Sequence, residues 1–215
     1  MTSEEIFSRV DHTLLKAAAS WAEIDKLCYE AARYKTASVC VPPSYVKPIK
    51  EAFADVVICT VIGFPLGYNL TAVKAFEAKE AIAGGASEVD MVINVGEVKN
   101  RNFDAVLAEI RTLREAAGTH ILKVIVETCY LDTDEKIKLC GLVSDAGADY
   151  IKTSTGFGQA GAVLNDILLF RKHLSPSVKI KASGGIRTRE AMEAFITAGA
   201  DRIGSSSAVA VLVRE

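Results

Sequence analysis

Several features that mark particular protein classes are missing from this sequence of 215 residues. No stretch holds eighteen consecutive apolar residues, so no membrane-spanning helix is expected. The formal net charge of −2 gives no overall attraction to nucleic acid or to an anionic membrane surface. Residues 1–7 are partly acidic and lack the apolar core of a signal peptide. We therefore expect a soluble, unprocessed protein that binds neither nucleic acid nor membrane.

Residues suited to metal or dinucleotide binding are also sparse or wrongly spaced. The five cysteines are an odd number without a Cys-x-x-Cys pair, which argues against a disulfide framework and a zinc site. The three histidines are not spaced as metal ligands. The loop at 63–67 has two glycines but lacks the Gly-x-Gly-x-x-Gly fingerprint. We expect no metal, no cofactor and a reducing, cytoplasmic compartment.

The sequence does contain a regular alternation of short β-branched runs with longer stretches of helical period. Such alternation predicts parallel strands joined by right-handed helical crossovers, and about eight such units can be recognised. Strands are expected at 10–14, 37–41, 56–63, 88–94, 121–127, 149–153, 178–182 and 201–204. Helices are expected at 21–34, 43–53, 72–84, 103–117, 132–146, 164–173, 189–198 and from Ser206 onward.

Several of the expected helices end in the same kind of turn. The sequence reads Ala-Gly-Gly-Ala at 83–86 and Ala-Gly-Ala-Asp at both 146–149 and 198–201. A glycine just past a helix permits the left-handed C-cap that returns the chain to a strand. This weak repeat is typical of the lower rim of a (β/α)8 barrel. We predict that residues 1–215 form a single-domain (β/α)8 TIM barrel with a short additional N-terminal helix.

Polar residues gather where the expected strands end, which is where barrels of this kind place their ligand chemistry. They include Asp11, Cys40, Asp90, Asn94, Lys123, Glu127, Lys152, Lys181 and Ser205. Strand alternation directs several of them to the barrel interior. Inward-facing charges are costly unless they are paired, so Asp90 and Glu127 are the expected partners of the lysines. Lys123 and Glu127 are expected to form an ion pair with a structural rather than a catalytic role.

Lys152 and Lys181, near the ends of two different strands, are the most informative residues. Two ammonium groups in one pocket repel, which favours loss of a proton from one and leaves an amine that can attack a carbonyl. Asp90 would supply the acid/base group that a Schiff-base enzyme needs. We take Lys152 as the nucleophile because a small, hydroxyl-rich turn follows it, although the residues alone allow the two lysines to exchange roles. The alternative is that both lysines are merely paired charges inside a barrel.

Glycines and serines mark a second functional element. Residues 183–187 follow the seventh expected strand and residues 204–207 follow the eighth, in the two loops that barrels often use to bind phosphate. Thr155 and Gly156 could close a third side, and Arg187 could add charge. This pattern predicts a phosphorylated substrate, whereas the alternative is that the glycines form ordinary turns and Ser206 an ordinary N-cap.

Seven sequence blocks, in this order, resemble the deoxyribose-phosphate aldolase family of class I aldolases, which fold as (β/α)8 barrels. The blocks are DHTLL at 11–15, SVCV at 38–41, VIGFPLG at 61–67, EVDMVIN at 88–94, KVIVET at 123–128, KTSTG at 152–156 and KASGGIR at 181–187. Together they span almost the whole chain. The resemblance agrees with the choice of Lys152 as nucleophile and removes its ambiguity.

The resemblance implies a carbon–carbon lyase that reversibly cleaves 2-deoxy-D-ribose 5-phosphate to D-glyceraldehyde 3-phosphate and acetaldehyde, in deoxyribose phosphate catabolism. It implies that Lys152 forms the Schiff base, that Asp90 donates and accepts protons, and that Lys181, supported by Asp11, lowers the pKa of Lys152 and also exchanges protons. The implied phosphate contacts are Gly184, Gly185, Gly204, Ser206, Ser207, Thr155 and Gly156. Cys40 and Asn94 are expected in the pocket, and a homodimer or homotetramer is expected.

The chain departs from some family members at two places. Phe157 stands where some carry a phosphate-facing lysine, and residues 211–215 lack the C-terminal tyrosine that some use in proton transfer. Two other functions stay open on the residues. One is a Schiff-base aldolase for a keto acid or ketose phosphate, which would need an anchor for a carboxylate or a further hydroxyl. The other is a phosphosugar-binding barrel without catalysis.

Overall fold

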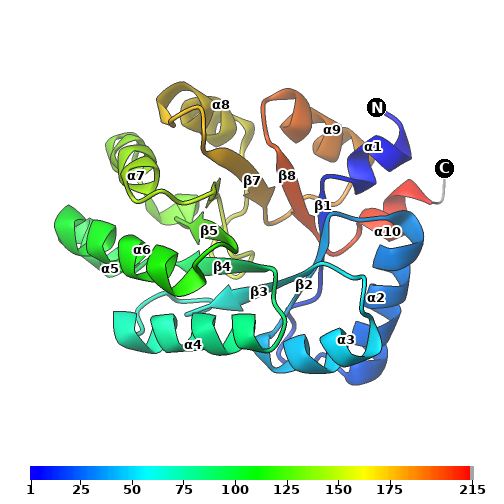
Figure 1. The fold of residues 1–215 in the computed structure, drawn as a ribbon. Coiled ribbons are helices and arrows are strands. Elements are labelled where there is room, and N and C mark those ends of the chain that lie inside the picture. Colours follow the sequence, from blue (N-terminus) through cyan, green and yellow to red (C-terminus); the bar gives the residue numbers. More distant parts are fainter. Residues whose placement is uncertain (214–215) are drawn as a thin grey trace.

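Eight parallel strands form a closed barrel in the computed structural model, which describes residues 1–213. The strands are β1 Val10–Thr13, β2 Ser38–Val41, β3 Ile58–Ile62, β4 Glu88–Val92, β5 Ile121–Ile125, β6 Tyr150–Lys152, β7 Lys179–Ser183 and β8 Arg202–Ser205. Each pairs with the next in sequence, and β8 closes the barrel on β1. Figure 1 shows the strands at the centre with helices around them. The predicted (β/α)8 barrel is confirmed.

Helices alternate with the strands as the sequence predicts. They are α2 Trp21–Tyr34, α3 Val46–Ala52, α4 Thr71–Ala83, α6 Phe103–Ala117, α7 Thr133–Asp145, α8 Leu164–His173, α9 Arg189–Thr197 and α10 Ala208–Leu212. The expected N-terminal helix is α1, Ser3–Phe7, and 3-10 turns lie at Pro43–Tyr45 and Thr128–Tyr130. The short helix α5, Val95–Lys99, was not predicted. Arg214 and Glu215, the last two residues of the segment 211–215 that lacks the C-terminal tyrosine, lie outside the described residues.

Two strands, β4 and β5, end two residues earlier than predicted, and each has a local cause. The expected strand 88–94 stops at Val92, and Asn94 instead caps α5 by accepting a hydrogen bond from the Gly96 backbone N–H at 3.0 Å. The expected strand 121–127 stops at Ile125, and Glu127 takes a left-handed conformation with φ 54°. Both strand ends therefore turn at the rim where the polar residues gather.

The helix ends also follow from the sequence. Ser20 and Glu23 form a capping box at the start of α2, as Asp132 and Glu135 do for α7. At the other ends, Gly147 and Gly199 have φ values of 70° and 111°, the left-handed region that a residue with a Cβ disfavours. The repeated Ala-Gly turn therefore reverses the chain from helix to strand, as expected.

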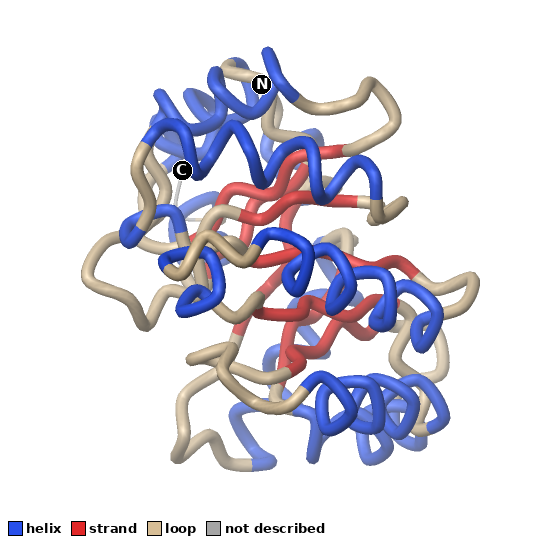
Figure 2. The backbone as a smooth tube through the Cα atoms, turned by 90° about the vertical axis from the view of Figure 1, so that its left-hand side faces the viewer, coloured by secondary structure: helices blue, strands red, loops and turns tan. Residues whose placement is uncertain are grey.

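The hydrophobic core lies between the barrel wall and the ring of helices. Outward-facing strand residues such as Val89, Val124 and Ile180 are fully buried, as are the helix residues Leu139 and Phe170 that belong to the same cluster. Figure 2 shows the strands enclosed by helices in a second view. Burying each such side chain contributes about 1.5–3 kcal/mol. The helix side of the sheet therefore stabilises the fold and leaves the barrel interior free for polar groups.

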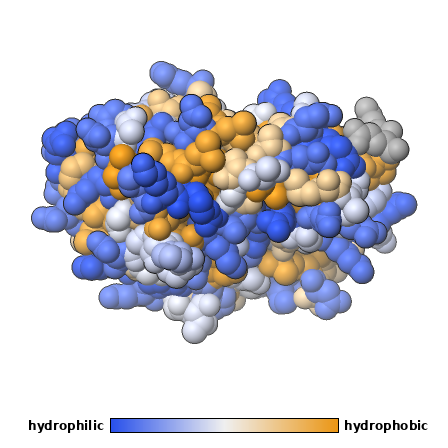
Figure 3. Space-filling view, turned by 90° about the horizontal axis from the view of Figure 1, so that it is seen from above, coloured by the Kyte–Doolittle hydropathy of each residue, from blue (hydrophilic) through white to orange (hydrophobic). Residues whose placement is uncertain are grey.

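The outer surface is mixed in character. Figure 3 shows one face on which hydrophobic residues lie in patches between hydrophilic ones. Within residues 1–213, no helix combines the length and apolar character needed to cross a membrane. The first and last helices meet, because Ser3 Oγ donates a hydrogen bond to the backbone oxygen of Leu212 at 3.3 Å.

Candidate active site

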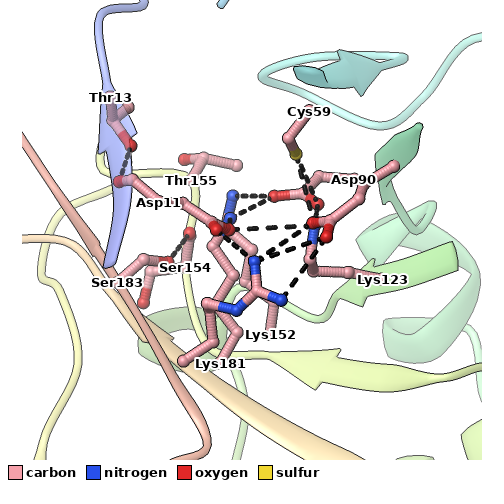
Figure 4. Close-up of polar contacts among 12 residues, drawn as sticks. Asp11, Thr13, Cys59, Asp90, Lys123, Lys152, Ser154, Thr155, Lys181 and Ser183 are labelled. Atoms are coloured by element: carbon pink, nitrogen blue, oxygen red, sulfur yellow. Dashed lines mark hydrogen bonds and ion pairs between the residues drawn. The ribbon is translucent and has the colours of Figure 1, made fainter. Parts of the chain in front are cut away.

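A cluster of charged side chains fills the middle of the barrel. Strand pairing aligns Asp90 with Lys123 and Lys152 with Lys181, and residues so aligned point to the same face. The cluster consists of Asp11, Glu88, Asp90, Lys123, Lys152, Lys181 and Arg202, of which all but Arg202 are buried. It thus joins three carboxylates to four cationic side chains, which come from β1, β4, β5, β6, β7 and β8. Figure 4 shows most of them converging.

Asp90 lies at the centre of this cluster. Lys152 Nζ and Lys181 Nζ each lie 2.7 Å from Asp90 Oδ2, and Lys123 Nζ donates to Asp90 Oδ1 at 2.8 Å. Burial alone would raise the pKa of Asp90, but the three lysines hold it well below its usual value. Asp90 is therefore ionised in the resting protein and can accept a proton.

Lys181 is held from two sides. Its Nζ lies 2.5 Å from Asp11 Oδ2 in addition to its contact with Asp90. Burial lowers the pKa of Lys181, but Asp11 and Asp90 outweigh burial and raise it well above its usual value. Asp11 is itself fixed, because its Oδ1 accepts hydrogen bonds from Ser38 Oγ at 2.7 Å and Arg202 Nη1 at 2.5 Å. Lys181 therefore stays a cation.

The expected pairing of Lys123 with Glu127 is wrong. Lys123 Nζ instead contacts Asp90 and lies 2.5 Å from Glu88 Oε2. The left-handed turn at Glu127 directs that carboxylate to Thr155, whose backbone N–H donates to it at 3.2 Å and whose hydroxyl also donates to it. Glu127 therefore orders the turn after Lys152 rather than pairing with Lys123.

A cavity of about 210 Å³ opens above the charged cluster, and Lys152 is part of its lining. Six of the seven predicted phosphate contacts also line it: Thr155, Gly156, Gly184, Gly185, Gly204 and Ser206. Ser207, the seventh, is not in this lining, and its hydroxyl lies 3.4 Å from Ser205 Oγ. Lys16, Phe157 and Arg187 complete the side of the cavity near these glycines and serines.

Two residues expected in the pocket do not line this cavity. Asn94 instead caps α5, and it lies beyond the end of β4 because the strand stops at Val92. Cys40 is fully buried within the barrel wall, where it clusters with Cys59 and Val61. The strand pattern places Cys40 on the interior face correctly, but it cannot show how deep the side chain lies.

Two glycines make room for the site. A Cβ on Gly204 would lie 2.9 Å from Ser183 Cβ and 3.3 Å from Lys181 Cε, so a side chain there would crowd both residues. Gly184 has φ 88°, and a Cβ on it would lie 2.9 Å from Gly161 Cα. These glycines are needed for close approach, which supports the interpretation of the two loops as more than ordinary turns.

The sequence did not single out Glu88, Arg202, Cys59 or Lys16, although the structure brings all four to the site. Glu88 lies two residues before Asp90, and Arg202 two residues before Gly204, so strand alternation could have found both. Cys59 faces the interior through its pairing with Glu88, a register that the sequence does not encode locally. Lys16 lies in a loop, where no periodicity applies.

The loop at 63–67 borders the site. Phe64 makes an edge-on contact with Phe157, with ring centroids 5.3 Å apart. Buried Lys74 holds the far end of the loop by donating hydrogen bonds to the backbone oxygens of Gly67 and Val92, and to Glu109 Oε1 at 2.8 Å. A buried ion pair thus fastens this loop to the end of β4.

Comparison with known proteins places the chain among aldolases. Residues 6–211 match the family described as DeoC/LacD family aldolase. A protein of Clostridium botulinum (strain Alaska E43 / Type E3) named deoxyribose-phosphate aldolase is 55% identical over 216 residues, covering 100% of this chain and 98% of the relative. One of the same name from Clostridioides difficile (strain 630) is 53% identical, covering 99% and 97%.

Solved structures agree with this match. A tetrameric deoxyribose phosphate aldolase from Aeropyrum pernix superposes with a TM-score of 0.92 at 34% identity, covering 99% of this chain and 91% of that one. The aldolase QR15 gives a TM-score of 0.94 at 39% identity, with coverages of 98% and 95%. The match spans nearly all of the chain, including every residue of the charged cluster. This chain therefore belongs to the DeoC/LacD family of aldolases.

Proposed function

We propose that this chain is a class I aldolase that reversibly cleaves 2-deoxy-D-ribose 5-phosphate to D-glyceraldehyde 3-phosphate and acetaldehyde. One observation carries the proposal: Lys152 Nζ and Lys181 Nζ both lie 2.7 Å from Asp90 Oδ2, beneath a cavity that Lys152 lines. A nucleophilic amine, a fixed cation and an acid/base carboxylate are the groups that Schiff-base chemistry requires. The name shared by the relatives points to the same reaction.

Lys152 is the nucleophile in this proposal. Its neutral amine attacks the aldehyde carbon of the open-chain sugar, and loss of water from the carbinolamine gives a protonated imine. Lys181 stays charged because Asp11 and Asp90 both contact it. Its charge therefore keeps Asp90 paired with a cation while the Lys152 amine reacts. Asp90 accepts and returns protons during these steps.

The carbon–carbon bond then breaks with the imine as electron sink. A base removes the proton of the C3 hydroxyl, the C2–C3 bond breaks, and its electrons form an enamine on Lys152. D-glyceraldehyde 3-phosphate leaves. Protonation of the enamine at C2 and hydrolysis of the resulting imine release acetaldehyde and restore Lys152. Asp90, 2.7 Å from Lys152 Nζ, is the carboxylate we assign to this proton exchange.

We place the phosphate of the substrate against the loops after β7 and β8. The cavity is lined there by Gly184, Gly185 and Ser206, with the cationic residues Lys16 and Arg187 alongside. The two successive glycines both have positive φ, 88° and 78°, a backbone conformation that can expose N–H groups to an anion. These residues support a phosphorylated substrate even though Phe157 stands where some relatives have a lysine.

A keto-acid donor fits this site less well than acetaldehyde. Leu15 and Phe64 pack against the cluster of Cys40, Cys59 and Val61, which adjoins Asp90. Figure 4 shows Cys59 and Ser183 on different sides of the lysines. A donor carboxylate on the Cys59 side would lie against apolar groups and lose hydration, and the cation nearest to Cys59, Lys123, is already paired with Glu88 and Asp90. A small donor such as acetaldehyde needs no such anchor.

Borohydride trapping tests the proposal. The protein is incubated with acetaldehyde or 2-deoxy-D-ribose 5-phosphate, reduced with borohydride and digested, and the peptide masses are measured by mass spectrometry. The two-carbon adduct is expected on the peptide that contains Lys152. Lys152→Ala and Lys152→Arg should give no adduct and no cleavage, since guanidinium does not deprotonate in proteins. Lys179→Ala is the matched control, because Lys179 is an exposed lysine at the start of β7. An adduct that persists in Lys152→Ala would refute the assignment.

We further propose that the chain forms a homo-oligomer, a dimer or tetramer. Leu66, Tyr68, Leu70, Val73 and Phe76 are each more than half exposed along the β3–α4 connection and α4, an arrangement that favours burial against another copy. The relative from Aeropyrum pernix is tetrameric. Sedimentation analysis would test the assembly.

We also propose a cytoplasmic location, which the five free thiols support, because thiols stay reduced in that compartment.

A further inference from the structure

Two cysteines face each other inside the barrel wall beside Asp90. Cys40 of β2 and Cys59 of β3 are partners in the strand register, and both are fully buried. Residues paired across neighbouring strands direct their side chains to the same face of the sheet. The two sulfur atoms and a carboxylate oxygen of Asp90 all lie within 4.8 Å of one another.

We propose that Cys40 and Cys59 form a modification site: peroxide oxidises them to a disulfide that reversibly lowers the aldolase activity. The effect on activity depends on the function proposed above, whereas the formation of the disulfide does not. The odd number and the spacing of the five cysteines argued against a disulfide framework. The strand register is what brings these two together.

The geometry permits the bond without moving the strands. Neighbouring strands lie about 4.8 Å apart, and disulfides join Cα atoms that are about 4.4–6.8 Å apart. Cys40 and Cys59 are Cα partners on such strands, so rotation of their side chains can bring the sulfur atoms together. Such a bond is reversible, because an external thiol can reduce it by thiol–disulfide exchange.

The pKa values of the two thiols are shifted in opposite directions, which suits Cys40 and Cys59 to successive steps of the oxidation. The neighbouring Cys59 and the ammonium of Lys181 lower the pKa of Cys40, against the effect of burial. Burial and the neighbouring Asp90 carboxylate raise the pKa of Cys59 well above its usual value. Burial also raises the pKa of Cys28 and of Cys140 to about 12. Cys40 is therefore the thiol to react first, and Cys59 the one to resolve it.

The chemistry balances with peroxide as the oxidant. The Cys40 thiol loses its proton, the thiolate attacks one peroxide oxygen, and the O–O bond breaks to give Cys40 sulfenic acid and hydroxide, which takes up that proton and leaves as water. The Cys59 sulfur then attacks the Cys40 sulfur, the S–O bond breaks, and a second water leaves with the thiol proton. Two thiols lose two electrons in total, peroxide gains them, and one S–S bond forms.

A metal ion would fit the same atoms poorly. Lys123 Nζ lies 3.3 Å from Cys59 Sγ and 2.8 Å from Asp90 Oδ1, so its ammonium already occupies the side of the cluster that a divalent cation would need. Lys152 and Lys181 contact the other oxygen of Asp90. Cations on all these sides stabilise a thiolate but repel a metal ion. The surroundings therefore favour oxidation over metal binding.

The disulfide would act on the site through Asp90. Cys59 Sγ donates a hydrogen bond to Asp90 Oδ1 at 3.2 Å, and Lys123 contacts both groups. Oxidation removes this donor and draws the sulfur toward β2, so Asp90 loses one of the contacts that fix its position. A displaced acid/base group lowers turnover on the order of 10²-fold. Reduction of the bond should restore the original contacts.

Peptide mapping after oxidation tests the site directly. The protein is treated with a small excess of hydrogen peroxide, its free thiols are alkylated, and it is digested with trypsin without reductant. Cleavage after Lys35, Lys50 and Lys74 places the two cysteines on peptides 36–50 and 51–74. We expect these peptides to be cross-linked and lighter by two hydrogen atoms than their sum. Turnover should fall on the order of 10²-fold and return with dithiothreitol.

Matched variants separate this site from general oxidation. Cys59→Ala should lose the reversible inhibition, because Cys40 sulfenic acid then has no resolving thiol and oxidises further. Cys129→Ala removes the partly exposed cysteine and should keep both the cross-link and the reversible loss. Absence of the 36–50 to 51–74 cross-link in the unmodified sequence, or the same reversible loss in Cys59→Ala, would overturn the proposal. A cross-link without loss of turnover would overturn the inhibitory role.

The mapping also stays informative if the proposed reaction is wrong. A protein that shows the cross-link but never cleaves 2-deoxy-D-ribose 5-phosphate contradicts the proposed function and leaves the thiol pair intact. A protein that cleaves the sugar phosphate but forms no cross-link contradicts only the thiol pair. The two proposals therefore fail through different measurements.

Discussion

Lys152 and Lys181 share one oxygen of Asp90, but only Lys181 has a second carboxylate. Both Nζ atoms lie 2.7 Å from Asp90 Oδ2, and Lys181 Nζ also lies 2.5 Å from Asp11 Oδ2. Removing a proton from Lys181 would leave two carboxylates short of a cation, whereas removing one from Lys152 leaves Asp90 with two other lysines. This asymmetry supports Lys152 as the nucleophile on geometric grounds alone.

Lys181→Met should shift the pH dependence of catalysis. Lys181 is one of the lysines that hold the pKa of Asp90 low, so without its charge Asp90 takes up a proton at higher pH, and the acid limb of the pH–rate profile should move to higher pH. Turnover at pH 7 should fall by at least about tenfold, and borohydride trapping at that pH should weaken with it. A steady-state cleavage assay between pH 5 and 10, within the stable range of the variant, measures the shift.

Lys179→Met is the control for this experiment. Lys179 lies on the same strand and faces the same way, but at the exposed end of β7, with its Nζ 5.7 Å from the Tyr150 ring centroid. Its loss should leave the profile in place. If Lys181→Met lowered turnover without moving the acid limb, Lys181 would have a structural role only.

The sequence predicted the barrel well because its main signals are local. The alternation of β-branched runs and helical stretches places all eight strands, and strand alternation brings Asp90, Lys152 and Lys181 inward. Deviations occur where a single side chain ends a strand. Asn94 caps the unpredicted α5, and Glu127 turns left-handed toward Thr155, so neither occupies the position that continued strands would give it.

Pairings across the barrel were harder to foresee. Lys123 pairs with Asp90 and Glu88 rather than Glu127, and Cys40 lies opposite Cys59, because β-strand register joins residues that are remote in the sequence. Lys16 reaches the cavity from a loop. Hydrophobic periodicity identifies which face a residue takes but not its neighbour on the next strand.

Acid should destabilise the protein through Asp11 and Asp90. The pKa of each lies well below its usual value, although burial opposes the effect, because cationic neighbours hold the charged form. The unfolded chain takes up these two protons near pH 4 while the native protein does not, so stability is lost as pH falls below about 4. Each group contributes up to about 1.4 kcal/mol per pH unit, which urea unfolding at pH 2.5–5 measures.

Asp11→Asn should reduce this acid dependence by about half, because one of the two groups no longer titrates. Its absolute stability should fall at all pH values, since Lys181 and Arg202 lose a buried partner. Asp104→Asn, at an exposed position in the first turn of α6, should keep the full slope. An unchanged slope in Asp11→Asn would show that other carboxylates dominate acid unfolding.

Two glycine substitutions should have opposite effects. Gly204→Ala places a Cβ 2.9 Å from Ser183 Cβ and 3.3 Å from Lys181 Cε, so it should cost about 1–3 kcal/mol of stability and displace Lys181. Gly141 lies inside α7 with open space where a Cβ would point, so Gly141→Ala should stabilise the protein by about 0.5–1 kcal/mol. Urea unfolding and the cleavage assay distinguish the two, and full activity in Gly204→Ala would contradict the crowding at Lys181.

Phe157→Lys should improve recognition of the phosphate. Phe157 is 56% exposed and lines the same cavity as Gly184 and Gly185, so an ammonium there can approach a bound phosphate. An ion pair at such a partly exposed position contributes about 0.2–1 kcal/mol, so KM for 2-deoxy-D-ribose 5-phosphate should fall by up to about fivefold. The gain should shrink at high salt, because screening weakens exposed charge pairs.

The comparison with unphosphorylated 2-deoxy-D-ribose isolates that charge effect. Phe157→Lys loses the edge-on contact with Phe64, a change that acts on both substrates alike. Phe157→Leu loses the same ring contact without adding charge, so the ratio of kcat/KM between the two sugars should rise in Phe157→Lys and stay constant in Phe157→Leu. A ratio that rises equally in both variants would mean that the wider cavity, and not the lysine charge, changes the preference, and it would argue against placing the phosphate beside Phe157.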